Sequence, residues 1–282
     1  MRKSIFLIIA IISIFLFTLL PAHSITTPTI VILIHGYSIT GSEGLDQWQS
    51  GINLYQQLID AGYIVGIVSY YGGFYINYSN GYQFSDPSFQ GTSNTPIENI
   101  AQELYIGLQN LYYYYGDVNI DIVAHSMGGL IVSEMMENEQ VSLTVQNVIF
   151  IGTPFLGSPF ASIASYLGLD IIVGYQVDEM VPGSTFLTNL QNNMGNISYY
   201  YPSTQLIVYA GNYDPWWGYL FFSGDNDGVV SVNSATAINY NYVYEFPDLH
   251  TSELDSFTYS GVSYFEDQNV ANTIISNLNF NY

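Results

Sequence analysis

The sequence predicts an α/β fold: a mostly parallel, doubly wound sheet of about six strands with helices on both faces. Two observations lead to this class. Short runs that are apolar at nearly every position are typical of strands buried on both faces, which occur in parallel sheets. Longer stretches with apolar residues at helical spacing alternate with these runs, as expected when each strand is followed by a crossover helix.

The predicted strands come at regular intervals along the chain. The first, TIVILI, ends directly before His35-Gly36, and the last is the least apolar of the set. The strands are expected at residues 29–34, 64–69, 120–124, 148–151, 206–209 and 243–246.

The predicted helices lie between and after these strands. One of them opens with Thr95-Pro96-Ile97-Glu98, a capping-box pattern that puts proline at the first helical position. The helices are expected at residues 45–61, 96–115, 127–138 and 270–278.

Two regions interrupt the alternation. Residues 70–95 are rich in Tyr, Gly, Asn and Ser and are predicted to be a loop. Residues 155–203 separate two strands and contain apolar pieces interrupted by glycine, which predicts a lid or cap insertion beside a substrate pocket. A structural excursion without a gating role is an equally good interpretation of this insertion.

The first 24 residues have the character of a secretory signal peptide. Arg2 and Lys3 precede an apolar run, and Ala22-His23-Ser24 suits cleavage after Ser24. Residues 25–282 are then one secreted domain, and a membrane anchor is the alternative if the leader is not cleaved. The apolar run is short for a spanning helix.

Charge is distributed very unevenly. The chain has 2 Lys+Arg, which are Arg2 and Lys3, and 23 Asp+Glu, all of which follow residue 24. Once residues 1–24 are removed, no lysine or arginine remains to neutralise phosphate, so binding to nucleic acid or to an anionic membrane is not expected. The composition also suggests an acidic working environment, since protonated carboxyl groups would leave few charges to repel one another.

The stretch IDIVAHSMGG, residues 120–129, ends a predicted strand in a turn close to G-x-S-x-G. This turn exposes a nucleophilic serine in the α/β-hydrolase fold, and it is crowded, so its flanking residues are small. Ala124 stands where glycine is usual, and its single methyl group is expected to fit. Ser126 is therefore the candidate nucleophile.

Chain order and elimination identify the candidate base. The fold places its catalytic groups in the order Ser, Asp or Glu, His. Of four histidines, His23 lies in the leader, His35 in the loop after the first strand, and His125 beside the serine with its side chain directed away. His250 remains, after the last predicted strand.

Three aspartates are candidates for the group that orients this histidine. Asp227 lies 23 residues before His250, Asp225 is two residues earlier, and Asp214 also follows the strand at 206–209. The Asp-x-Asp-Gly start at Asp225 fails as a calcium loop, because no glutamate follows at the required spacing.

The oxyanion hole is expected to use two backbone N–H groups. In this fold one belongs to the residue after the nucleophile, Met127, and the other to the loop after the first strand, where Tyr37 is the expected donor.

Several of these segments resemble bacterial true lipases. DIVAHSMGG and HGYS are similar to the small Bacillus-type enzymes, and NDGVVSVNSA with the following Leu249-His250 is similar to Burkholderia/Pseudomonas-type triacylglycerol lipases. GTPFLGS at 152–158 resembles a segment of lipase and esterase relatives. The resemblance implies Ser126, Asp227 and His250 as the triad. The larger lipases carry a calcium-binding aspartate where this chain has Ser252, so no metal or cofactor is expected.

The predicted function is that of a secreted serine hydrolase of the lipase and esterase type. It would act through an acyl-enzyme on small-molecule or lipid esters without charge, with transient contact to a lipid interface. A polyester depolymerase, an acyltransferase and a non-catalytic cell-surface binding protein with the same shell are the alternatives.

Overall fold

The computed structural model describes residues 29–38, 45–166, 174–251 and 261–279. The predicted leader at 1–24, its alternative as a membrane anchor, His23 and Ser252 lie outside the described residues. Among the described helices, none is long and apolar enough to cross a membrane.

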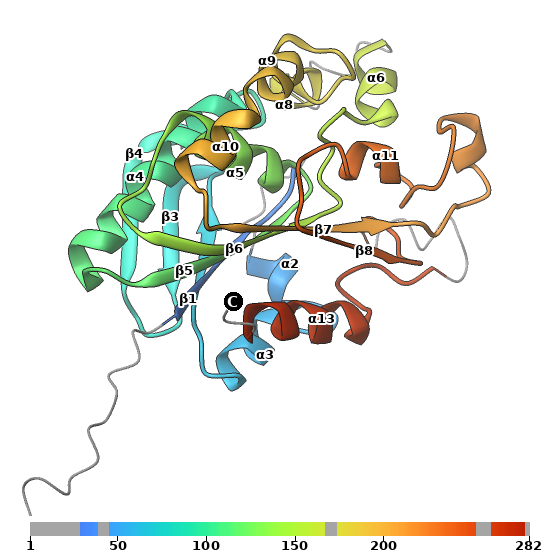
Figure 1. The fold of residues 1–282 in the computed structure, drawn as a ribbon. Coiled ribbons are helices and arrows are strands. Elements are labelled where there is room, and N and C mark those ends of the chain that lie inside the picture. Colours follow the sequence, from blue (N-terminus) through green and yellow to red (C-terminus); the bar gives the residue numbers. More distant parts are fainter. Residues whose placement is uncertain (1–28, 39–44, 167–173, 252–260, 280–282) are drawn as a thin grey trace, which may run out of the picture.

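One sheet organises the described residues (Figure 1). It has eight strands in the order β4-β3-β2-β1-β5-β6-β7-β8. All six predicted strands are present and parallel: β1 Thr29–Ile34, β2 Ile64–Ser69, β5 Asn119–His125, β6 Thr144–Ile151, β7 Gln205–Gly211 and β8 Tyr242–Phe246. The chain winds from β1 out to β2 and then returns to β5 on the other side of β1. The switch point between β1 and β5 is where open α/β sheets bind ligands, at the carboxyl ends of the strands.

The region predicted as a loop at residues 70–95 instead forms an antiparallel hairpin. Its strands are β3 Gly72–Tyr78 and β4 Gln83–Gly91, and they extend the sheet beyond β2. Phe74, Ile76 and Tyr78 alternate with less buried residues and face the core. The prediction was wrong because a strand covered on one face alternates apolar and polar residues, and here the polar ones are loop-forming types.

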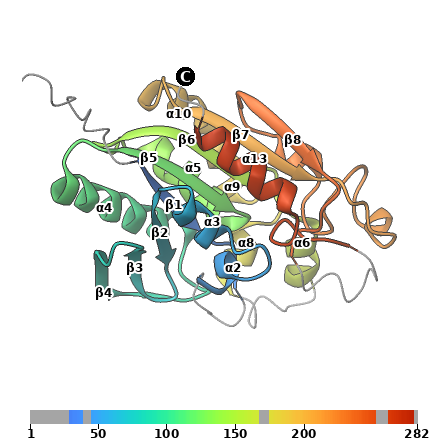
Figure 2. The same ribbon diagram turned by 90° about the horizontal axis from the view of Figure 1, so that it is seen from below.

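Helices cover both faces of the sheet (Figures 1 and 2). On one face lie α2 Leu45–Gln49, α3 Leu54–Asp60 and α13 Gln268–Asn279; Figure 2 shows α3 and α13 in front of the strands. On the opposite face lie α4 Ile97–Tyr115 and α5 Met127–Asn138. A separate hydrophobic core fills the space on each side of the sheet.

The predicted helix at 45–61 is divided in two. Gly51 adopts φ 54°, and a Cβ there would lie 2.0 Å from the carbonyl oxygen of Phe265. Asn53 then starts α3, because its side chain accepts a hydrogen bond from the N–H of Gln56. Contact with the segment before α13 therefore breaks a periodicity that is continuous in the sequence.

Helix α4 begins one residue later than predicted, and without the capping box. Pro96 lies outside the helix and offers no side-chain cap, while Thr95 accepts from the N–H of Thr92. The first helical N–H, that of Ile97, donates to the carboxylate of Glu179 at 3.0 Å. Glu179, which is distant in sequence, therefore caps the start of α4 in place of the predicted capping box.

The insertion at 155–203 contains four described helices. They are α6 Pro159–Tyr166, α8 Tyr175–Glu179, α9 Thr185–Asn193 and α10 Gly195–Tyr200; residues 167–173 between them are outside the described residues. Of these four helices, α9 and α10 pack against α5. Phe186, Leu187, Leu190 and Ile197 are buried in the same core as α5. Helices α9 and α10 are therefore an integral part of the core on this face.

Candidate active site

Ser126 stands on a strained turn between β5 and α5. Its φ of 53° and ψ of −126° are unusual for any residue other than glycine, and such a conformation costs about 1–3 kcal/mol. The N–H of Ser126 donates to the carbonyl oxygen of Ile151 at 2.8 Å, which fixes the turn against β6. The strain places the serine side chain at the carboxyl edge of the sheet, at the switch point.

Small residues allow this turn to form. A Cβ on Gly36 would lie 2.9 Å from Cβ of Ser126, and one on Gly128 would lie 2.4 Å from the carbonyl oxygen of His35. Gly129 is as restricted, because its Cβ would lie 2.0 Å from Oγ1 of Thr153. Ala124 is fully buried between Ile34 and Phe150 on the neighbouring strands.

Ser126, His250 and Asp227 come together in one hydrogen-bonded chain. The Ser126 hydroxyl donates to Nε2 of His250 at 2.9 Å, and Nδ1 of His250 donates to Oδ2 of Asp227 at 2.7 Å. All three residues are buried. This is the geometry of a nucleophile, a base and a group that orients the base.

Two backbone N–H groups distinguish Asp227 from the other candidate acids. Oδ1 of Asp227 accepts from the N–H groups of Val229 and Val230 at 2.9 and 2.7 Å, which directs Oδ2 toward the histidine. Asp214 instead accepts from the backbone and side chain of Asn226, and Asp225 is exposed. Of the three, only Asp227 reaches His250.

Tyr264 is a further member of the site that sequence reasoning missed. Its buried hydroxyl donates to Oδ2 of Asp227 at 3.0 Å, the oxygen that also accepts from His250. Burial and the neighbouring Asp227 raise the pKa of Tyr264 well above its ordinary value, so it is a neutral donor. No motif marks it, since it is one of 27 tyrosines.

Replacing Tyr264 by phenylalanine is expected to lower kcat/KM of the predicted ester hydrolysis by roughly 3- to 10-fold. The ring would still fill its buried space, and Asp227 would lose one of its hydrogen bonds. Tyr209→Phe is the matched control, because this buried tyrosine bonds to Asn277 rather than to the triad. Equal kinetics of the two variants would contradict a positioning role for the Tyr264 hydroxyl.

Gly152 lies directly beneath the acid and the base. It has φ 54°, and a Cβ there would lie 3.0 Å from both Oδ2 of Asp227 and Nδ1 of His250. The Gly152-Thr153-Pro154 segment therefore has a steric reason for its glycine.

The side chain of His125 links Gln47 of α2 to the backbone of His250. Its Nδ1 accepts from the side-chain amide of Gln47 at 2.6 Å, and its Nε2–H donates to the carbonyl oxygen of His250 at 3.2 Å. Burial lowers the pKa of His125 well below its ordinary value, with a smaller contribution from His250. A neutral ring with Nε2 protonated fits both hydrogen bonds.

The loop after β1 lies against the nucleophile. The hydroxyl of Tyr70, whose ring stacks on His35 with centroids 4.0 Å apart, bonds to the carbonyl oxygens of His35 and Gly36. Burial lowers the pKa of His35 to about 4, so its ring is neutral near pH 7. Tyr37 follows this fixed segment. Met127 is the first residue of α5, and the N–H groups at the start of a helix can bind a negatively charged oxygen. Of the two expected oxyanion donors, Met127 therefore directly follows Ser126, and Tyr37 lies in the loop that packs against Ser126.

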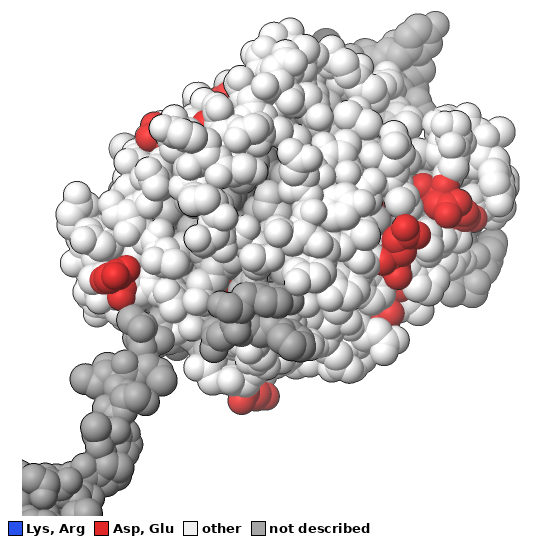
Figure 3. All heavy atoms as spheres, viewed as in Figure 1, with Lys and Arg blue, Asp and Glu red and all other residues white. Residues whose placement is uncertain are grey.

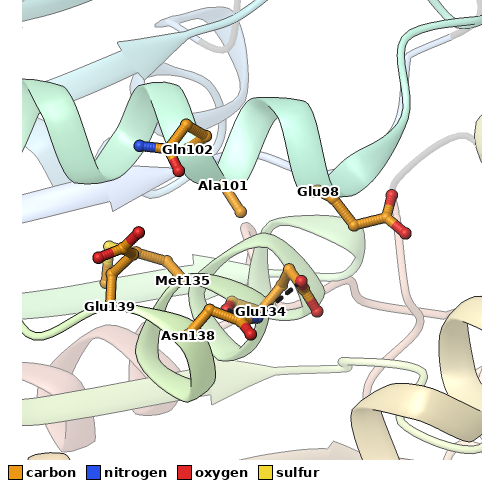
Figure 4. Close-up of a pocket in the computed structure, with 7 residues that line it drawn as sticks. All are labelled: Glu98, Ala101, Gln102, Glu134, Met135, Asn138 and Glu139. Atoms are coloured by element: carbon orange, nitrogen blue, oxygen red, sulfur yellow. Dashed lines mark hydrogen bonds between the residues drawn. The ribbon is translucent and has the colours of Figure 1, made fainter.

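A separate pocket of about 190 Å³ lies between α4 and α5 (Figure 4). Its lining is acidic and includes Glu98, Glu134 and Glu139, with Asn138 bonded to Glu134. It contains no triad residue. Within the described ranges, no group of three or more acidic, histidine or cysteine side chains could hold a metal ion.

The sheet order and the serine turn after β5 together define the α/β-hydrolase fold. The predicted fold class is thus confirmed, with eight strands rather than about six.

Comparison with known proteins places the chain beside bacterial lipases of this fold. The family model of lecithin:cholesterol acyltransferase matches residues 106–216. The mature lipase BlEst2 of Bacillus licheniformis superposes with a TM-score of 0.56 at 19% identity, over 90% of this chain and 93% of that one.

Two further structures superpose over 90% of this chain, each at 17% identity. They are the lin2722 gene product of Listeria innocua, with a TM-score of 0.52 over 96% of its chain, and the ydeN gene product of B. subtilis, with 0.51 over 100%. A search of curated protein sequences found no match. The resemblance to bacterial lipases and esterases is confirmed at the level of the fold.

Proposed function

We propose that the protein is a secreted serine hydrolase that cleaves uncharged carboxylic esters through an acyl-enzyme. The observation that carries the proposal is the hydrogen-bonded chain from Ser126 Oγ through His250 to Asp227. The similarity in fold to the lipase BlEst2 of Bacillus licheniformis supports the same class of reaction.

The proposed reaction begins when the Ser126 oxygen attacks the acyl carbonyl carbon. Nε2 of His250 takes the serine proton as the C–O bond forms, and the N–H groups of Tyr37 and Met127 stabilise the negative oxygen of the intermediate. His250 then gives the proton to the leaving alcohol. Water, activated by His250 in the same way, releases the acid and restores Ser126.

Asp227 has two tasks in this scheme. It holds the imidazole with Nδ1 protonated, so that Nε2 is free to accept from Ser126, and it stabilises the imidazolium that forms.

The mature chain without lysine or arginine suits a substrate that is not recognised through an anionic group.

A fluorophosphonate probe is expected to label the protein, and Ser126→Ala is expected to abolish the labelling completely. Ser133→Ala, in the same helix region but buried away from the triad, is the matched control and should label normally. A panel of p-nitrophenyl esters beside emulsified triglyceride would then define the acyl chain length. Failure of the intact protein to label would favour a binding protein with a hydrolase shell.

Acyl transfer to an alcohol is the second candidate, and the match to the lecithin:cholesterol acyltransferase model favours it. Both reactions share the acyl-enzyme and differ in the acceptor. Product analysis with a long-chain alcohol present separates them, because a transferase forms a new ester while a hydrolase releases the free acid.

A further inference from the structure

Residues 214–226 form an excursion between β7 and the segment that carries Asp227. Its ends meet in two hydrogen bonds: the N–H of Asp214 donates to the carbonyl oxygen of Asn226 at 2.9 Å, and the N–H of Asn226 donates to Oδ1 of Asp214 at 2.8 Å. The neck of the excursion therefore lies one residue from the acid of the triad. In Figure 1 it is the orange loop that projects beside α11 (Val232–Ala235).

Aromatic contacts hold the inner side of this excursion against the insertion. Phe160 of α6 lies 5.5 Å from Trp217, 5.6 Å from Phe221 and 6.4 Å from Phe222, measured between ring centroids. Phe222 is buried. The excursion is thus a packed structure, joined to α6 on one side and to the acid segment on the other.

The outer side presents large apolar side chains to solvent. Trp216 is 71% exposed, Tyr219 76% and Leu220 73%, and the short 3₁₀ turn Gly218–Leu220 brings the last two together. No charged residue occurs from Pro215 to Gly224. Single exposed apolar residues are ordinary on a protein surface, whereas several on one turn mark a site of interaction. Trp and Tyr are also the residues that favour the boundary between water and lipid.

Charge indicates which surface this turn fits. The described residues contain no lysine or arginine, and the whole chain carries a formal net charge of −21. Figure 3 shows no basic side chain on the face in view. An anionic lipid surface would repel such a molecule, and so would a second copy of the chain. An uncharged lipid surface does not repel the protein electrostatically.

We propose that Trp216, Tyr219 and Leu220 dock the protein onto the surface of an aggregated, uncharged lipid ester. This inference rests on the proposed function, and it means that the active site meets its ester substrate at the surface of an aggregate rather than as single dissolved molecules. Docking through a loop whose neck adjoins Asp227 would bring the ester surface close to the triad. The adsorbed area is apolar, so the affinity comes from burial of side chains rather than from ion pairing.

The test measures adsorption without turnover. Ser126→Ala protein is floated with a triolein emulsion and, separately, with phosphatidylglycerol vesicles. We expect adsorption to triolein and little to the anionic vesicles. Adding Trp216→Ser and Leu220→Ser should lower the bound fraction on triolein by about tenfold or more. Tyr113→Ser with Tyr199→Ser is the matched control, since these side chains are 81% and 79% exposed on other elements, and it should adsorb like the parent.

Three results would overturn the proposal: equal adsorption of the docking variant and the parent, stronger adsorption to the anionic vesicles, or a dimer in sedimentation velocity that the docking variant abolishes. The proposed function fails differently. If the unsubstituted protein hydrolyses a monomeric ester while its Ser126→Ala form does not adsorb to triolein, only the docking surface is contradicted. If the Ser126→Ala form adsorbs while the unsubstituted protein hydrolyses no ester, only the proposed reaction is contradicted.

Discussion

Asp227→Asn is expected to lower kcat for ester hydrolysis by about 10⁴-fold, the loss known for the same change in a serine protease triad. The surroundings of Asp227 give this expectation a specific reason. Oδ1 accepts from two backbone N–H groups, so an asparagine would place its oxygen there and turn its amide group toward His250. That amide would donate to Nδ1 and leave the proton on Nε2, which could no longer accept from Ser126.

The other two candidate acids are the controls for this experiment. Asp225→Asn and Asp214→Asn change the same loop and the same formal charge, and neither carboxylate reaches His250 in the structure. Both should keep kcat within about threefold of the parent, since each changes only interactions made outside the triad. A loss at Asp225 that matched the loss at Asp227 would contradict the assignment of the acid.

The sequence alone predicted Ser126 and His250 as partners, and the structure brings them into contact; their catalytic roles stay predictions. The prediction was possible because the elbow motif is local and only one histidine stood in the right order. Position in the chain did not separate Asp227 from Asp225 and Asp214, since all three lie among turn-forming residues, and only the resemblance to lipases favoured Asp227. What separates them is the direction of one carboxylate, which depends on the fold of Val229 and Val230 around it.

Other parts of the site have no sequence signal at all. Tyr264 joins the triad because the segment before α13 pairs with Leu249, next to His250. Gln47 reaches His125 from a short helix near the start of the chain. Each contact joins residues that no spacing rule relates. The missed hairpin β3–β4 has a similar origin, because its strands are recognisable only once the core face beneath α4 is known.

Stability is expected to fall as the pH rises from about 5 to 9, the reverse of ordinary acid denaturation. Among the described residues, burial raises the pKa of five carboxyl groups to about 7 or higher: those of Asp121, Glu134 and Asp248 to about 7, that of Glu179 to about 8 and that of Glu137 to about 9. Each group therefore stays protonated in the folded chain at a pH where it ionises in the unfolded chain. The stability linked to these protons is complete below the ordinary pKa values, 3.8 for Asp and 4.5 for Glu, and is lost as the pH rises from there through the raised values.

The absence of basic partners makes this pH dependence unusual. Glu179 of α8 and Glu98 of α4 lie near one another, and Glu134 of α5 adds a further negative charge when ionised. Since the described residues contain no lysine or arginine, ionisation cannot be compensated by an ion pair. Thermal unfolding followed by circular dichroism should show a melting temperature roughly 5–15 °C lower at pH 9 than at pH 5.

Glu137→Gln removes the carboxyl group whose pKa burial raises furthest among these five. The carboxyl group of Glu137 is almost fully buried, and neither oxygen has a hydrogen-bond partner in the described structure. A glutamine cannot ionise, so the melting temperature of this variant should decline less steeply above pH 7 than that of the parent. Glu139→Gln, a change of the same type at a less buried position on the edge of the pocket in Figure 4, is the matched control. A parent whose melting temperature rises between pH 5 and 9 would contradict the buried, protonated state of these groups.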